Sequence, residues 1–174
     1  MEIITIPLDG ALEHKDSMGN AGVIRHGEIQ VMSAGTGIYH SEFNHLKEAA
    51  TSLLQIWVFP NKKNVSPRYD QKSIEGLKKT NQFYPIVTPN TSDSGMWIHQ
   101  DAWFHLGDFD THTTTSYRIH KKGNGVYVFT IEGDARVADE TLSRRDALGI
   151  WDTEVFEISA KPGTRLLLME VPMN

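Results

Sequence analysis

The sequence contains no cysteine, which excludes disulfides, thiolate zinc sites and cysteine nucleophiles together. Any metal ion must therefore be held by histidine and carboxylate side chains, and the chain has eight histidines. The chain also lacks a run of about 18 apolar residues, and its first residues, MEIITIPLDG, hold neither a basic segment nor a long apolar one. We therefore expect no membrane span and no secretory signal, and a cytoplasmic location is the simplest interpretation.

Basic residues are the minority of the charged residues. There are 17 Lys and Arg against 22 Asp and Glu, which gives a formal net charge of −5. This balance argues against a basic phosphate-binding surface, so nucleic acid is not expected as a direct partner. The glycine-rich nucleotide-binding motifs and the Gly-x-Ser-x-Gly elbow are absent too, which leaves nucleotide binding and serine hydrolysis without support.

Helix signals are scarce, and short runs rich in β-branched and aromatic residues dominate between Gly, Asn, Asp and Pro turns. The only helix expected is a short one within Gln71 to Lys79, weakened by Gly76 inside it. Twelve short strands at this spacing predict an all-β sandwich or barrel. They are expected at residues 2–7, 11–16, 28–34, 37–43, 53–60, 83–89, 96–109, 113–120, 125–133, 134–139, 154–160 and 164–172.

A weak internal repeat suggests two related modules. IPLDGALEHKD and FTIEGDARVAD share an apolar run, an acidic residue, a glycine and a second alternating strand. This order is typical of a tight β-hairpin. Residues 61–82 are polar and poor in β-branched residues, as in a connector. We expect a boundary near Pro89 to Gly95, with residues 1–90 forming the first module and its connector and residues 91–174 the second.

His40 and Glu42 are the strongest candidate metal ligands. Side chains alternate between the two faces of a strand, so these two residues share one face of the strand expected at 37–43. Gly35 and Gly37 permit a sharp turn just before it. An imidazole and a carboxylate one repeat apart can reach one ion, although such a pair is also a common surface or core feature.

The wording and order of several motifs resemble the pirin family. These are LEHKDSMGN, GEIQVMSAGTGIYHSEFN and LQIWVFP followed by SPRYDQ in the first module, with HQDAWFHLGDF, VYVFTIEGDARV and LGIWD in the second. The resemblance implies a bicupin of two β-barrel or jelly-roll cupin domains, with one metal, usually iron, in the first domain only. It also implies quercetin 2,3-dioxygenase activity on a small flavonol-like aromatic. Carried over by position, His40 and Glu42 match the last two of four ligands, three histidines and one glutamate.

The other two ligands of the family pattern lie in a His-Pro-His stretch that would precede Met1, so the first cupin is expected to be incomplete at its N-terminus. Three explanations stay open: a fragment of a longer protein, a naturally short form without the metal, or a site rebuilt from other residues. The nearest spare groups in the first module are Glu2, His14 and His26. Iron or another divalent transition metal is therefore the expected cofactor, and its absence from this chain stays open.

In the second module, His112 and His120 lie where a cupin carries ligands, but no His-x-His is present, so a metal-free domain is expected. His99 and His105 are expected in packed positions rather than at a metal.

Two functions compete. One is a metal-dependent dioxygenase in which Glu42 also acts as the catalytic base. The other is a non-catalytic cupin that binds a small molecule or a regulatory protein partner. Exposed strand edges of an incomplete barrel also predict a homodimer.

Overall fold

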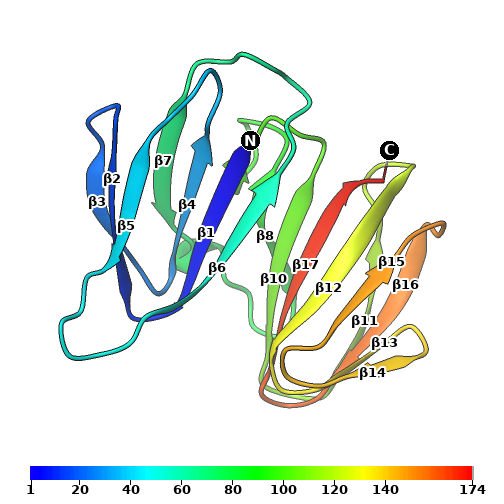
Figure 1. Ribbon diagram of the computed structural model, residues 1–174. Coiled ribbons are helices and arrows are strands. Elements are labelled where there is room, and N and C mark those ends of the chain that lie inside the picture. Colours follow the sequence, from blue (N-terminus) through cyan, green and yellow to red (C-terminus); the bar gives the residue numbers. More distant parts are fainter. Residues whose placement is uncertain (174) are drawn as a thin grey trace. The chain divides into compact units, whose positions relative to one another are not determined.

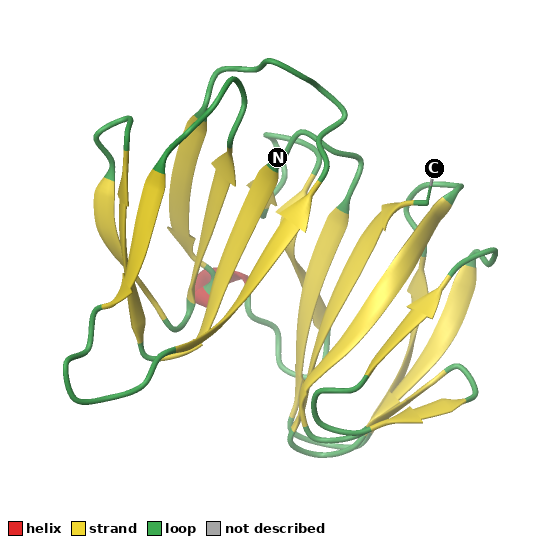
Figure 2. Cartoon of the chain, in the orientation of Figure 1, coloured by secondary structure: helices red, strands yellow, loops and turns green. Residues whose placement is uncertain are grey.

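The computed structural model describes residues 1–173, and these form two compact units. Unit 1 comprises residues 1–76 and 90–100, and unit 2 comprises residues 77–89 and 101–174. The chain is therefore interleaved: residues 77–89, which we assigned to the first module, group with the second unit. Figure 2 shows that strands dominate both units and that the helix is very short.

Unit 1 contains two antiparallel sheets (Figure 1). The first has the strand order β6-β1-β4-β7 and the second has the order β3-β2-β5. Their bounds are β1 Glu2–Asp9, β2 Ala11–Asp16, β3 Ala21–Arg25, β4 Glu28–Ser33, β5 His40–Asn44, β6 Ser52–Val58 and β7 Arg68–Ser73; β9, Met96–Trp97, also belongs to this unit.

Strand alternation decides what lies between these two sheets. Thr5 of β1 pairs with Gln30 of β4 and with Gln55 of β6, so the three side chains share one face of the first sheet. Hydrogen bonds from Gln30 and Gln55 reach side chains of the second sheet. The space between the two sheets of unit 1 therefore carries polar side chains from both of them, which is unusual for a β-sheet interior and makes it a candidate functional site.

Unit 2 also pairs two antiparallel sheets, with the strand orders β15-β12-β17-β10-β8 and β11-β16-β13-β14. The strands are β8 Phe83–Thr88, β10 Trp103–Phe109, β11 Thr113–Arg118, β12 Asn124–Glu132, β13 Ala135–Val137, β14 Glu140–Leu142, β15 Ala147–Ile150, β16 Val155–Ala160 and β17 Thr164–Pro172. An apolar core built by both sheets includes Phe109, Val128, Ile158 and Leu168. Each such side chain stabilises the fold by about 1.5–3 kcal/mol when fully buried.

The all-β prediction is confirmed, and the short helix expected within Gln71 to Lys79 is present as a single turn. Residues 71–73 end β7, and only Glu75–Leu77 form a helix, η1, of the 3₁₀ type. β7 has a charged sequence, so its alternation is not apparent from the sequence alone. In this strand, Tyr69 and Gln71 point to the same face as Gln30. No helix within residues 1–173 has the length and apolar character needed to cross a membrane.

Candidate metal half-site and its surroundings

The turn that precedes β5 depends on glycine. Gly35 has a φ of 52°, and a Cβ added there would lie 2.1 Å from the carbonyl oxygen of Val65. Only glycine allows both this backbone conformation and this close approach without displacing the neighbouring segment. Gly37, with a φ of 137°, closes the turn by donating its N–H to the carbonyl of Ala34 at 2.8 Å. β5 then begins at His40.

His40 and Glu42 lie on one strand with a single residue between them, so their side chains leave β5 on the same face. In the β2–β5 register, Glu42 is opposite His14 and His40 is opposite Asp16. The His40 and His14 rings stack with their centroids 5.8 Å apart. The structure therefore places both predicted ligands beside His14.

The Glu42 carboxylate is held at one oxygen and open at the other. Its Oε2 accepts a hydrogen bond from Gln55 Nε2 at 2.7 Å. Its Oε1 is buried and has no hydrogen-bond partner among residues 1–173. A buried carboxylate oxygen without a donor is costly, and a cation would satisfy it. Gln55 was missed by the sequence analysis, although its place between two apolar residues of an alternating strand was a usable signal.

His14 does not offer a free lone pair to this cluster. Its ring is fully buried, with Nδ1 3.2 Å from Gln30 Nε2 and Nε2 3.4 Å from Asp16 Oδ2. If the Gln30 amide donates to Nδ1, the proton of the neutral ring is on Nε2 and points to Asp16. Tyr69 stacks on the His14 ring with centroids 4.8 Å apart, and its pKa is raised to about 12 by burial and by nearby carboxylates, including Asp16.

Asp16 is an ionised partner for this histidine. Burial raises the pKa of the Asp16 carboxyl, but hydrogen bonds from Asn20, His14 and the Met18 backbone outweigh it, so the pKa is lower than usual. His14 therefore has both ring nitrogens engaged and supports the site by position. It is not a third ligand in this arrangement.

The other spare groups do not join the cluster. Glu2 is fully buried, but it points to the opposite face of β1 from Thr5; its Oε2 accepts from Ser33 Oγ at 2.8 Å and from the His99 backbone N–H at 3.2 Å. His26 is exposed, in the turn between β3 and β4. Across residues 1–173, no group of three or more His, Asp or Glu side chains is arranged to hold a metal ion. His40 and Glu42 therefore form a half-site.

The histidines of the second module divide into two kinds. His112 lies outside β11, is exposed, and has its Nε2 3.1 Å from Ser159 Oγ. The rings of His99 and Trp97 form a T-shaped contact, with centroids 4.9 Å apart and an interplanar angle of 88°. His105 and His120 instead meet in unit 2, with ring centroids 5.2 Å apart. Sequence reasoning did not connect these two.

Comparison with known proteins decides the family. The family model described as Pirin matches residues 1–58, and the model described as Quercetinase C-terminal cupin domain matches residues 85–171. A quercetin 2,3-dioxygenase of Escherichia coli K12 is 33% identical over 172 residues, which cover 99% of this chain and 73% of that protein. The chain belongs to the pirin family. It is an all-β bicupin of the quercetinase-like kind, as the sequence resemblance implied.

Other relatives in the pirin family agree. A pirin-like protein of Caulobacter vibrioides is 33% identical over 171 residues, covering 98% of this chain and 73% of that protein. The crystal structure of YhhW from Escherichia coli superposes with a TM-score of 0.91 at 32% identity, covering 98% of this chain and 71% of that one. The structure of the bacterial pirin YhhW in complex with nickel(II) also gives 0.91, at 31% identity, over 99% of this chain and 72% of that one.

Proposed function

We propose that unit 1 supplies His40 and Glu42 as two ligands of a divalent transition-metal centre of the quercetinase type. The observation that carries this proposal is the buried Oε1 of Glu42, which has no hydrogen-bond partner within residues 1–173 while Gln55 fixes Oε2. His40 leaves the same face of β5 and supplies an imidazole. The nickel(II) complex of a related bacterial pirin supports a divalent ion of this kind.

The ligand count limits what these residues can do alone. Catalytic metal sites usually have three protein ligands, and the described residues bring together two. His40 and Glu42 therefore fit part of such a centre, and we expect them to hold an ion weakly without further ligands. The chain covers 73% of the length of the Escherichia coli relative.

The substrate class that we propose is a small hydroxylated aromatic, because several relatives are named quercetin 2,3-dioxygenase. A bound divalent ion would act as a Lewis acid that makes a substrate hydroxyl more acidic. In this chain, Glu42 is the group proposed to take the hydroxyl proton, since its carboxylate is within the polar interior of unit 1. Gln55 is a positioning residue that holds this carboxylate in place.

The same ligand count favours a second candidate function, a non-catalytic cupin that binds a small molecule. Such a protein would use the polar interior of unit 1 for hydrogen bonding and would turn over no substrate. Oxygen consumption with quercetin, measured in the presence of added metal, separates the two functions. Binding without oxygen consumption supports the second, and consumption that requires Glu42 supports the first.

A homodimer through strand edges stays a prediction, to be checked by sizing with light scattering.

The metal proposal is tested by titrating the untagged chain with nickel(II) and following binding by calorimetry. We expect one weak site per chain that is lost in His40→Ala and in Glu42→Gln. His45→Ala is the matched control, because His45 is exposed and pairs with Glu13 at 3.2 Å rather than with this cluster. Binding that survives both His40→Ala and Glu42→Gln would overturn the proposal.

A further inference from the structure

A second polar cluster lies inside unit 2 and shares no residue with the metal half-site of unit 1. It joins His105 of β10, Tyr117 of β11, Glu170 of β17, His120 after β11 and Asn124 at the start of β12. Glu170 is fully buried, and the exposed fractions of Tyr117, Asn124 and His105 are 5%, 5% and 8%. A buried group of this kind in a β-sheet core needs every donor and acceptor matched.

Glu170 is the acceptor around which this cluster is arranged. Its Oε2 accepts from Tyr117 Oη at 3.0 Å and lies 2.8 Å from His120 Nδ1, and its Oε1 accepts from Asn124 Nδ2 at 2.9 Å. The backbone N–H groups of His120 and Lys121 also donate to it, at 3.0 and 3.1 Å. Burial raises the pKa of Glu170, but hydrogen bonds from His120, Asn124 and Tyr117 outweigh it and lower the pKa.

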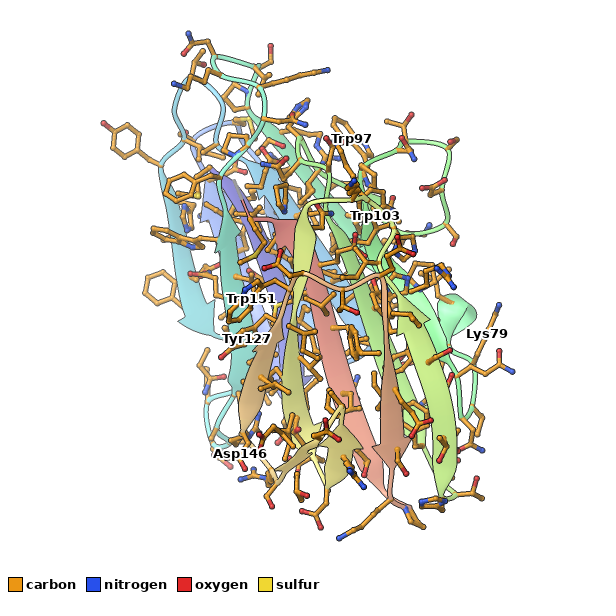
Figure 3. All side chains as sticks on the ribbon, turned by 90° about the vertical axis from the view of Figure 1, so that its right-hand side faces the viewer. Lys79, Trp97, Trp103, Tyr127, Asp146 and Trp151 are labelled. Atoms are coloured by element: carbon orange, nitrogen blue, oxygen red, sulfur yellow. The ribbon has the colours of Figure 1, made fainter. Side chains whose placement is uncertain are left out.

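The ionised carboxylate fixes the proton on the His120 ring. A carboxylate only accepts hydrogen bonds, so His120 Nδ1, 2.8 Å away, must carry a hydrogen. In the neutral imidazole, Nε2 is then an acceptor. Trp103 stacks on the same ring with centroids 5.0 Å apart and an interplanar angle of 10°, which limits how the ring can turn (Trp103 is labelled in Figure 3).

The contact with Tyr117 fixes the position of the proton on the His105 ring in the same way. The single hydroxyl hydrogen of Tyr117 goes to Glu170, so its oxygen accepts from His105 Nδ1 at 3.3 Å. Burial, reinforced by the neighbouring His120, lowers the pKa of His105 to about 4, although Glu170 opposes this shift. At neutral pH, His105 is therefore an uncharged ring with its hydrogen on Nδ1 and a lone pair on Nε2.

Both imidazoles line one cavity of about 470 Å³ in unit 2, together with Phe83, Ser116 and Arg118. Their Nδ1 atoms are used by Tyr117 and Glu170, which leaves the two Nε2 lone pairs for a ligand in this cavity. The rings are nearly parallel, with an interplanar angle of 18°. Lone pairs lie in the ring planes, so those of the two rings lie in nearly parallel planes, a poor arrangement for binding one metal ion about 2.1 Å from each nitrogen.

We propose that this cavity binds a small planar ligand with two hydroxyl donors in the meta relation on one aromatic ring, each donating to one Nε2 atom, of His105 and of His120. Two acceptors on nearly parallel rings need donors at a matching separation; the ring centroids are 5.2 Å apart, and the proposal takes the two Nε2 atoms to be separated by a similar distance. Hydroxyls on adjacent ring carbons are too close together for two parallel bonds. This site requires no metal and none of the residues of unit 1.

The test uses the whole chain with EDTA present, so that no metal in unit 1 contributes. Resorcinol is the probe, 1,3-dimethoxybenzene is the matched compound without donors, and catechol has its two hydroxyls on adjacent carbons. Imidazole ¹⁵N chemical shifts from NMR report the tautomers and the hydrogen bonds directly. We expect resorcinol to shift the Nε2 signals of His105 and His120 in a saturable way. Catechol should bind at least about tenfold more weakly, and 1,3-dimethoxybenzene should not bind.

Two variants and a control complete this test. His105→Phe and His120→Phe should each weaken resorcinol binding by about tenfold or more, whereas His112→Ala, outside the cavity, should leave it unchanged. Hydrogen on Nε2 of both rings in the free chain would overturn the proposal. So would equal binding of resorcinol and its dimethyl ether. Both results come from the unaltered chain, so they decide the matter even if a variant fails to fold.

Discussion

Replacing Glu170 by alanine should destabilise the protein more than any other single carboxylate removal in unit 2. The carboxylate is fully buried and accepts hydrogen bonds from Tyr117, Asn124, His120 and the backbone N–H of Lys121. Removing a buried ionised acceptor costs about 3–5 kcal/mol, because the buried donors left behind have no acceptor. We expect a loss of this size in the free energy of unfolding.

The assay is urea unfolding at pH 7, followed by far-ultraviolet circular dichroism. Glu170→Gln keeps the shape of the side chain and one acceptor oxygen, so it should lower the free energy of unfolding by less, about 1–3 kcal/mol. Glu157→Ala is the control, since Glu157 is exposed on β16, and its loss should stay within about 0.5 kcal/mol. A loss below about 1 kcal/mol for Glu170→Ala would refute the view that Glu170 organises this cluster.

Further predictions concern pH, the turn before β5 and the metal half-site. The folded-state pKa of His105 is lowered from 6.5 to about 4, so the unfolded chain binds more protons than the folded chain between these pH values. The free energy of unfolding should therefore fall by up to about 3 kcal/mol as the pH drops through this window. In His105→Phe, the midpoint of urea unfolding should depend less on pH. Gly35→Ala should cost about 1–3 kcal/mol in urea unfolding, and Gly76→Ala, which meets nothing within 4 Å, almost nothing. Gln55→Leu should weaken nickel(II) binding about tenfold in calorimetry by releasing Glu42, and unchanged affinity would contradict its positioning role.

Much of the fold could be predicted from the sequence, because most strands alternate clearly or form continuous apolar runs. The run GVYVFTIEG lies within β12 except for its last glycine, and TRLLLMEVP matches β17. β3, β7, β14 and β15 were missed, and all four lie at the edge of a sheet. β3 and β7 show the reason. Both lie at the edge of a sheet and carry few buried side chains, so their sequences show little contrast between an apolar and a polar face.

The candidate site was predictable only where it is local in the chain. His40 and Glu42 are two residues apart, so strand periodicity alone placed them on one face. The contact of Gln55 with Glu42 bridges two sheets, and that of His120 with Glu170 joins residues 50 positions apart. Such pairs follow from sheet order and register, which local pattern does not specify.

The most direct test of the metal proposal is anomalous diffraction at the nickel edge from crystals of this chain soaked in nickel(II). High metal concentration fills even a weak site, so the ligand count is no obstacle. The proposal predicts a peak about 2.0–2.2 Å from a His40 ring nitrogen and from Glu42 Oε1. A soaked crystal with no peak there, but with peaks at exposed histidines such as His26 or His45, would contradict it.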